Sequence, residues 1–209
     1  CLVVACPGSG KTRVISTKIQ ALLERHPNAR ICAVTFTRDS AGELTRRVEA
    51  DIGSARLNHS CRIGTFHSLA IRQLRNHGKL GKVLGPQEQM AFLRRAIGMT
   101  DPSMERDEAV AVLERAKGSL SECAEQKSDL YVAYQGLLAK NKVTDLYDVI
   151  RNSVQWMKDG SIHPFPVQFM LVDEFQDTDG LQLEWVLEHA KNGTAVTVVG
   201  DDDQSIYGW

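Results

Sequence analysis

The chain has 209 residues, 43% of them hydrophobic, which is enough for one well-buried core with room for a smaller appended domain. Its 25 basic and 26 acidic residues give a net charge of −1, which excludes a globally basic surface and confines any nucleic-acid contact to a local groove. The five cysteines are scattered without a CxxC pair, and no apolar run approaches a membrane span, which argues against disulfide frameworks, zinc sites and membrane insertion and favours a cytoplasmic protein.

Short apolar runs alternate with helical patterns along the chain, which indicates an α/β protein with a parallel sheet covered by helices. Helices are expected from Lys11 to about Arg25, from Ser40 to about Ile52, and after Phe66. Strands are expected at Leu2 to Ala5, Ile31 to Phe36, Arg62 to Thr65, Phe169 to Val172 and Ala195 to Val199.

The middle of the chain differs in composition from both ends. From Pro86 to about Met157 only helical patterns occur, and no strand signal interrupts them. This stretch is therefore expected to be an α-helical insertion between two strands of the sheet. The expected organisation is a core of residues 1–80 and 158–209 with a helical subdomain over residues 81–157.

The first strand leads into a glycine-rich segment that opens a helix, and this segment carries the strongest chemical signal. In such a turn, backbone N–H groups and the positive end of the helix point at one place, which suits a polyphosphate. Lys11 can reach the β and γ phosphates, and the Thr12 hydroxyl can ligate Mg²⁺. The pattern therefore predicts a site for a nucleoside triphosphate. The segment reads Ala5-Cys6-Pro7-Gly8-Ser9-Gly10-Lys11-Thr12, and all of it except Cys6 is expected to contact the nucleotide.

A second chemical motif is the apolar run from Phe169 to Val172 followed by two acids. A strand buried on both faces delivers these acids to the carboxyl-terminal edge of the sheet, where ligands bind in open α/β folds. Asp173 is the natural partner of the Mg²⁺ held by Thr12, directly or through a water. Glu174 is then placed to polarise the water that attacks the γ-phosphate.

Several strings in the chain resemble motifs of the UvrD/Rep/PcrA family of superfamily 1 DNA helicases. The matches follow the family's order and cover the whole chain, closely at both ends and loosely in the middle. The strings similar to motifs II and III are Val172-Asp173-Glu174-Phe175-Gln176-Asp177-Thr178 and Val199-Gly200-Asp201-Asp202-Asp203-Gln204-Ser205-Ile206-Tyr207-Gly208-Trp209. Ala33 to Thr37 is similar to motif Ia, Gly64 to His67 to motif Ib, and Tyr134-Gln135 with Thr144 to Val149 to the segment that ends the insertion.

The resemblance implies a RecA-like ATP-binding core that uses ATP and Mg²⁺ and moves on single-stranded DNA and its junctions with duplex. Lys11, Asp173 and Glu174 keep the roles derived above, and Gln204 is implied to sense the γ-phosphate. The resemblance also implies a surface that binds single-stranded DNA, where aromatic side chains would stack on bases without regard to sequence. The alternative for Phe36 and His67 is ordinary packing at strand ends. The implied DNA-binding positions are Thr35, Phe36, Thr37, Thr65, Phe66, His67, Tyr207 and Trp209.

Two departures from the family pattern affect these expectations. Arg38-Asp39 replaces the Asn-Lys common after motif Ia, and Asp39 is expected to cap the following helix instead of contacting DNA. Tyr147 stands where the family usually has an acid, which leaves the roles of Asp145 and Asp148 open.

The chain is expected to be a fragment, because the resemblance implies an adenine-reading glutamine upstream and a second RecA-like domain with arginine fingers beyond Trp209. The expected activity of the parent protein is ATP-dependent 3′ to 5′ translocation and unwinding in DNA repair, replication or recombination, with the isolated fragment nearly inactive. Two alternatives remain: a helicase–nuclease subunit, and a nucleotide-gated DNA-binding protein without motor activity.

Overall fold

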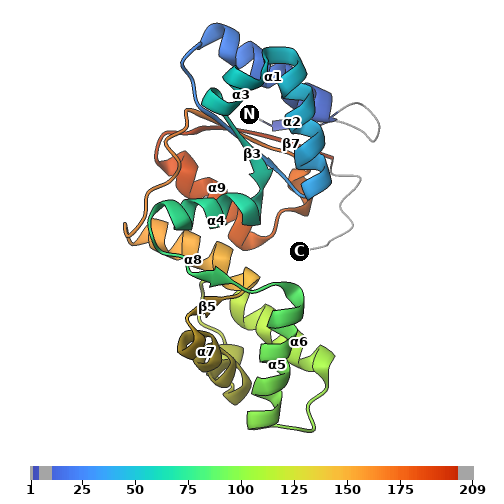
Figure 1. Cartoon of the computed structure of the whole chain (residues 1–209), viewed down its shortest axis with the longest axis vertical. Coiled ribbons are helices and arrows are strands. Elements are labelled where there is room, and N and C mark those ends of the chain that lie inside the picture. Colours follow the sequence, from blue (N-terminus) through green and yellow to red (C-terminus); the bar gives the residue numbers. More distant parts are fainter. Residues whose placement is uncertain (1, 5–10, 202–209) are drawn as a thin grey trace. The chain divides into compact units, whose positions relative to one another are not determined.

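The computed structural model describes residues 2–4 and 11–201, with side chains from residue 12 onward. Its internal contacts divide the chain into two compact units, shown in Figure 1. One consists of Cys1–Leu69 and Pro164–Trp209, and the other of Ala70–His163. Across the described ranges, every helix is too short or too polar to span a bilayer.

A parallel sheet of five strands forms the middle of the first unit, in the order β1-β7-β6-β2-β3 (Figure 1), which confirms the expected fold class. Strand β2 is buried along its whole length, as expected for a strand covered on both faces. The register places Val34 opposite Val172 on one side and Thr35 opposite Thr65 on the other, so three carboxyl ends meet at one edge. The strands are β1 (Leu2–Val4), β2 (Ile31–Thr35), β3 (Cys61–Thr65), β6 (Phe169–Val172) and β7 (Ala195–Gly200).

Helices α1, α2 and α3 cover one face of this sheet (Figure 1). Ile15, Ile19 and Leu23 recur every four residues, so they share one side of α1. They pack in one apolar core with Leu44 and Val48 of α2. The helices are α1 (Lys11–Arg25), α2 (Arg38–Ile52) and α3 (Ser54–Ser60).

Helix α9 (Gly180–Lys191) lies on the other face of the sheet (Figure 1). Its residue Trp185 is the centre of a cluster of rings. Phe66 and Phe165 meet Trp185 edge-on, with ring centroids 6.0 and 6.1 Å away. The His189 ring lies 4.1 Å from the Trp185 ring, and both side chains are fully buried. These rings therefore form part of the buried core of the first unit.

Two helices of this unit have no counterpart among the sequence expectations. Helix α3 has seven residues, which is too short for a period to show. Helix α9 could have been predicted from the sequence, because Asp179 is a typical N-cap residue. In the structure Asp179 is the N-cap and accepts the Gln182 N–H at 2.8 Å. Leu181, Trp185 and His189 then follow at a spacing of four.

The second unit is built mainly from helices around its own core, in which Leu93, Leu113 and Tyr134 are buried. The expectation of helices alone is wrong at Val143–Thr144, because this segment pairs in parallel with Lys82–Val83. Strands of two residues give no alternation for sequence reasoning to detect. The elements are α4 (Phe66–Asn76, beginning in the first unit), β4 (Lys82–Val83), α5 (Pro86–Thr100), α6 (Arg106–Lys117), η1 (Ala124–Lys127), α7 (Asp129–Asn141), β5 (Val143–Thr144) and α8 (Leu146–Lys158).

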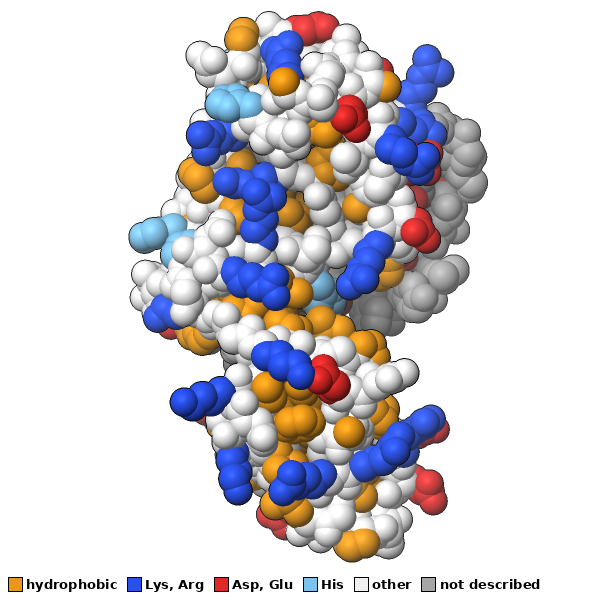
Figure 2. All heavy atoms as spheres, in the orientation of Figure 1, with side chains coloured by type: hydrophobic (Ala, Val, Ile, Leu, Met, Phe, Trp, Pro, Cys, Tyr) orange, Lys and Arg blue, Asp and Glu red, His pale blue; other side chains and the backbone are white. Residues whose placement is uncertain are grey.

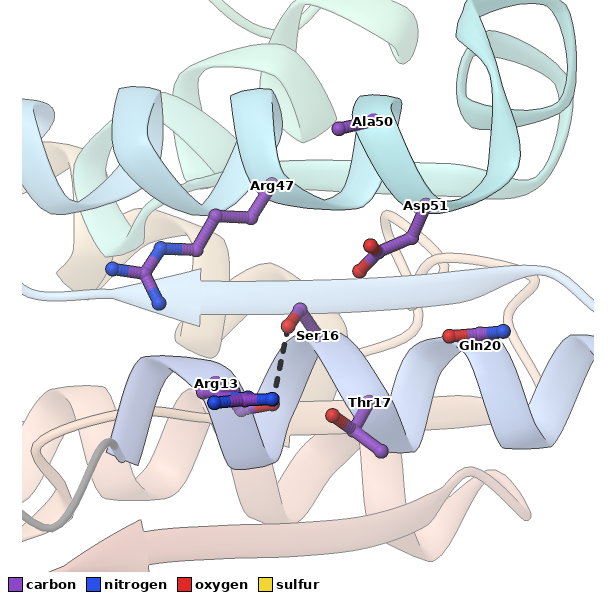
Figure 3. A pocket seen from close by; sticks show the side chains of 7 residues that line it. All are labelled: Arg13, Ser16, Thr17, Gln20, Arg47, Ala50 and Asp51. Carbon is purple, nitrogen blue, oxygen red and sulfur yellow. Dashed lines mark hydrogen bonds between the residues drawn. The ribbon is translucent and has the colours of Figure 1, made fainter.

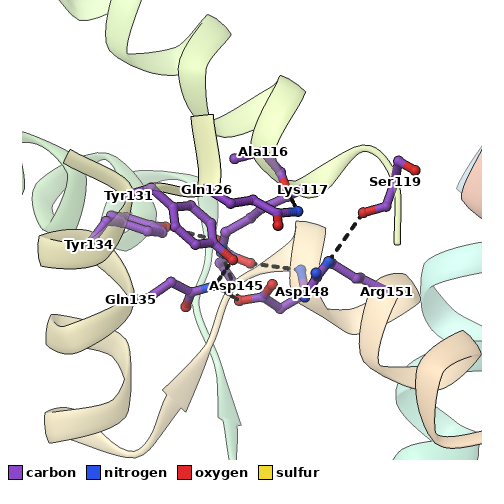
Figure 4. A network of polar contacts seen from close by, with 10 residues as sticks. All are labelled: Ala116, Lys117, Ser119, Gln126, Tyr131, Tyr134, Gln135, Asp145, Asp148 and Arg151. Carbon is purple, nitrogen blue, oxygen red and sulfur yellow. Dashed lines mark hydrogen bonds and ion pairs between the residues drawn. The ribbon is translucent and has the colours of Figure 1, made fainter. Parts of the chain in front are cut away.

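A buried polar network ties the helices of this unit together (Figure 4). Lys117 is fully buried, and its Nζ lies 2.7 Å from Oδ2 of Asp145 and 2.7 Å from Oδ2 of Asp148. Tyr134 donates its hydroxyl to Asp145 Oδ2 at 2.9 Å, and Gln135 donates to Asp148 Oδ2 at 3.3 Å. Asp145 also caps α8, since its Oδ1 accepts the Asp148 N–H at 2.8 Å. Both acids whose roles the sequence left open are thus engaged in holding α6, α7 and α8.

Candidate functional site

Asp173 and Glu174 follow strand β6 at the carboxyl-terminal edge of the sheet. The Asp173 N–H donates to the Val34 carbonyl at 2.9 Å, so the sheet pairing extends into the acidic pair. Asp173 is only 4% exposed, and its Oδ1 accepts the Glu174 N–H at 3.0 Å. The Asp173 carboxylate is therefore fixed by the backbone at the edge where open α/β sheets bind ligands.

Thr12 lies half-buried in the first turn of α1, the helix that follows β1. Strand β1 pairs in parallel with β7, and β7 pairs with β6, so β1 ends at the same edge of the sheet that carries Asp173. The remaining residues expected to hold phosphate, namely Ala5, Pro7, Gly8, Ser9, Gly10 and the side chain of Lys11, lie outside the described residues.

The donor atoms of Asp173 and Thr12 fit Mg²⁺. Carboxylate and hydroxyl oxygens are the hard ligands that Mg²⁺ prefers, and this ion usually takes one or two carboxylates together with substrate phosphates. Within residues 2–4 and 11–201, His, Cys, Asp and Glu side chains form no group of three or more that could hold a metal alone. A magnesium ion that arrives with nucleotide phosphates matches this sparse donor set.

Glu174 has an unusual backbone, with φ 48° and ψ 47° in the left-handed region. Residues other than glycine pay about 1–3 kcal/mol for such a conformation, which persists only where the surroundings fix it. Gln176, in the short helix η2 (Phe175–Asp177), donates its Nε2 to Glu174 Oε2 at 2.8 Å. Sequence reasoning missed Gln176, and the available signal was its place two residues after the acid within the same motif.

The residues expected to contact DNA near β2 differ in their exposure. Phe36 follows the strand end and is 43% exposed, so part of its side chain is open to solvent. The Thr35 side chain is fully buried and donates to the Thr37 carbonyl at 3.1 Å, which makes it part of the turn. We therefore correct the expectation for Thr35, whose hydroxyl shapes the loop instead of facing solvent.

The cap of α2 is Thr37, and the expectation that Asp39 caps this helix is wrong. Thr37 Oγ1 accepts the Ser40 N–H at 3.1 Å, while Asp39 lies within the first turn. An acid in the first turn still suits the positive end of the helix. Thr37 is exposed, so its hydroxyl lies at the surface beside Phe36.

On β3 the expected residues lie next to those of β2, because Thr65 is the register partner of Thr35. Thr65 is half-buried, and its Oγ1 accepts the Ser68 N–H at 3.3 Å. His67 is also half-buried, and burial lowers its pKa, against the opposing influence of the Asp179 carboxylate. Phe66 is only 3% exposed because it packs on Trp185, so we correct its assignment from DNA contact to core.

Three further expected site residues, Gln204, Tyr207 and Trp209, lie outside the described residues. The chain is described as far as Asp201, which follows β7 and is buried. The Asp201 N–H donates to Gln176 Oε1 at 3.1 Å. Asp201 therefore lies directly beside the Gln176 amide that also contacts Glu174.

An open hollow of about 490 Å³ lies between α1 and α2 (Figure 3). Arg13, Ser16, Thr17 and Gln20 line it from α1, and Arg47, Ala50 and Asp51 line it from α2. Arg47 also pairs with Glu43 along its own helix. Because the lining combines two cations, one acid and neutral amide and hydroxyl groups, it selects no class of ligand.

The surface carries local excesses of positive charge although the chain is nearly neutral. On the face shown in Figure 2, Lys and Arg side chains predominate over Asp and Glu. A nucleic-acid backbone can be held by such local charge without a globally basic protein.

Comparison with known proteins gives a consistent family. A family model described as the UvrD/REP helicase N-terminal domain matches residues 1–209. The chain is 34% identical to DNA helicase II of Salmonella typhimurium, covering 100% of this chain and 32% of that protein. It is 30% identical to ATP-dependent DNA helicase PcrA of Bacillus subtilis, covering 100% of this chain and 31% of that protein. It is 28% identical to ATP-dependent DNA helicase srs2 of Schizosaccharomyces pombe, covering 99% of this chain and 28% of that protein. The chain thus spans about a third of the length of these relatives.

Proposed function

The chain belongs to the UvrD/REP helicase family, and from that premise we propose that it is the first motor domain of an ATP-dependent DNA helicase. The observation that carries the proposal is the position of Asp173 and Glu174 at the end of β6, beside the end of β2 that carries Phe36. One edge of a single sheet then holds both the acidic pair proposed for ATP hydrolysis and the start of a surface proposed to bind single-stranded DNA.

For the ATP site, we propose that the phosphate loop from Ala5 to Thr12 holds the triphosphate and that Lys11 neutralises its charge. Thr12 and Asp173 would hold Mg²⁺, which would offset the negative charge of the phosphates. Glu174 would accept the proton of the attacking water as general base. Gln204 would report the state of the γ-phosphate to the DNA site.

For the DNA site, Phe36 supplies an exposed ring at the end of β2, and Thr37 supplies a surface hydroxyl beside it. Thr65 and His67 lie at the end of the neighbouring strand and extend the same edge. We propose that these groups, continued by Tyr207 and Trp209, form a track for single-stranded DNA. Stacking tolerates any base, which a translocating motor needs.

The names of the relatives support helicase activity for the longer protein, and 3′ to 5′ direction remains part of the proposal. We propose that its partners are single-stranded DNA, junctions of single and double strands, and a second RecA-like domain in the same full-length chain. The helical unit Ala70–His163 would be the insertion subdomain of this motor. A cytoplasmic location is part of the proposal, because the five cysteines are scattered along the sequence without a CxxC pair.

The proposal is tested with the full-length protein that contains this chain. We expect ATP turnover that rises on addition of single-stranded DNA, and unwinding of a duplex with a 3′ tail in preference to one with a 5′ tail. Nucleotide and DNA binding without DNA-stimulated turnover or unwinding would show a nucleotide-gated binding protein instead. Cleavage of the DNA in the same assay would show a helicase–nuclease subunit.

A further inference from the structure

Gln176 occupies a position between the acidic pair and the end of β7, and no role derived above includes it. It lies in η2, two residues after Glu174, and its side chain is half-buried. Its Nε2 donates to Glu174 Oε2 at 2.8 Å, and its Oε1 accepts the Asp201 N–H at 3.1 Å. One amide group therefore joins the proposed general base to the backbone that follows β7.

The two hydrogen bonds fix the orientation of this amide. The carboxylate of Glu174 can only accept, and the backbone N–H of Asp201 can only donate. If the oxygen and nitrogen of the Gln176 amide were exchanged, its oxygen would face the Glu174 carboxylate, which is also an acceptor. Its NH₂ group would then face the Asp201 N–H, which is also a donor. The arrangement thus gives Gln176 one stable orientation, and its bond to an ionised oxygen belongs to the stronger class of hydrogen bond.

Gly200 leaves the space that this amide occupies. A Cβ atom at position 200 would lie 2.8 Å from Gln176 Oε1, and real Cβ atoms essentially never make so short a contact. The backbone N atoms of Phe175 and Gln176 would lie 3.4 Å from the same Cβ. Since Gly200 is the last residue of β7, the strand end and the amide fit each other only without a side chain there.

The backbone of Glu174 adds a second constraint. Its left-handed conformation sets the direction in which the side chain leaves the chain, and its N–H is held by Asp173 Oδ1. The side chain still has rotatable bonds beyond Cα, and the Gln176 bond restricts them at the far end. A general base misplaced by about 1 Å can lose roughly 100-fold in rate, so this restraint matters for the reaction.

We propose that Gln176 is a positioning residue that holds the Glu174 carboxylate in its working orientation and ties it to the strand end leading to Gln204. This inference rests on the proposed function, since it assigns Glu174 the role of base. Gln176 need not touch ATP, Mg²⁺ or water. A change in the segment after β7 would move the Asp201 N–H, then the amide, and so the carboxylate.

The experiment uses three variants of the full-length protein: Gln176→Met, Gln176→Glu and Gly200→Ala. Gln176→Met removes both hydrogen bonds, Gln176→Glu keeps an acceptor for Asp201 but loses the donor, and Gly200→Ala displaces the amide without a change of charge. Gln155→Glu is the matched control, because Gln155 is exposed on α8. We expect kcat for DNA-stimulated ATP hydrolysis to fall about 10- to 100-fold in the three variants. The Kd for a fluorescent ATP analogue should stay within about threefold of the wild-type value in the three variants and in the control.

A melting-temperature cycle without nucleotide tests the contact independently of activity. Gln176→Glu places a carboxylate beside Glu174 and should lower Tm, whereas in a Glu174→Gln background the same change restores a donor–acceptor pair and should not. Wild-type kcat in Gln176→Met and Gln176→Glu would overturn the inference while leaving the proposed function intact. Equal losses of Tm in both backgrounds, with parallel losses of kcat and nucleotide affinity, would also overturn it, because they indicate a structural role only. A wild-type protein without DNA-stimulated turnover would instead overturn the proposed function.

Discussion

Lys117 holds the helical unit together through charge, and its replacement gives the sharpest test of that packing. Its ammonium group is fully buried between Asp145 and Asp148, and Tyr134 shares the same cluster (Figure 4). Lys117→Met keeps most of the side-chain volume but leaves two buried carboxylates without their cation. Removal of one partner from a buried ion pair usually costs about 3–5 kcal/mol of unfolding free energy, and we expect a loss in that range.

The loss should depend on pH in a defined direction. The pKa of Asp148 is raised by burial, while the Lys117 charge opposes this and the Asp145 charge adds to it. A carboxyl group whose folded-state pKa is raised favours the folded state below its unfolded pKa, and this contribution disappears as pH rises through the folded pKa. Without Lys117 the folded pKa rises further, so the deficit of Lys117→Met should be small near pH 4 and largest near neutrality.

Urea unfolding followed by circular dichroism measures this deficit, with Lys140→Met as control because Lys140 is exposed on α7. The control should change stability by less than about 0.5 kcal/mol. Adding Asp148→Asn to Lys117→Met should recover part of the loss, since it removes one of the uncompensated charges. A loss in Lys117→Met no larger than in the control, or one that does not vary between pH 4 and 7, would refute this account of the network.

Three other predictions concern the first unit. Phe36→Ala should weaken binding of single-stranded DNA by about 1–3 kcal/mol at constant salt, measured by fluorescence anisotropy, with no loss of Tm; unchanged affinity would remove Phe36 from the DNA track. Phe66→Ala should instead lower the unfolding free energy by about 3–5 kcal/mol, because it empties space beside Trp185, and a fully stable variant would contradict its place in the core. Burial lowers the pKa of His189 to about 4, so its contribution to stability is present above pH 6.5 and is lost as pH falls toward 4, by roughly 3 kcal/mol in all. His189→Phe should flatten the stability curve over that range in urea titrations, and an unchanged curve would assign the acid sensitivity to another group.

Much of the fold could be predicted from the sequence because its elements have strong periods. The strand Phe169 to Val172 was expected with the bounds that the structure shows, and the expected helix from Lys11 to Arg25 likewise agrees with α1. A buried parallel strand is a continuous apolar run, and a helix of four turns repeats its apolar stripe several times. Strands β4 and β5 have only two residues each and show no such repetition. Their paired residues, such as Lys82 and Val143, are 61 positions apart in the sequence.

The positions of Asp173 and Glu174 were predictable because both residues directly follow a strongly patterned apolar strand, while their roles stay predictions. The environment of Phe66 was not predictable, because its motif position suggested DNA while Trp185, more than a hundred residues later, lies against its ring. The same holds for Thr37 and Asp39, two polar residues near one helix start, where backbone geometry selects the cap.

Gln176 shows the limit of reasoning from sequence at this site. Its neighbours along the chain explain the bond to Glu174, but the partner of its oxygen is Asp201, which only the pairing of β6 with β7 brings close. The need for glycine at position 200 likewise follows from a contact between two strand ends. The contact forms only in the folded protein, because its two halves belong to separate motifs of the chain.

The central claim is that Glu174 is the base of a DNA-stimulated ATPase. The most direct measurement is steady-state ATP turnover by the full-length protein with saturating single-stranded DNA, comparing wild type with Glu174→Gln, together with the Kd for ATP and DNA. We predict strong stimulation in the wild type and a fall in kcat of about 100-fold or more in Glu174→Gln, with both Kd values unchanged. Turnover by Glu174→Gln at the wild-type rate would contradict the account.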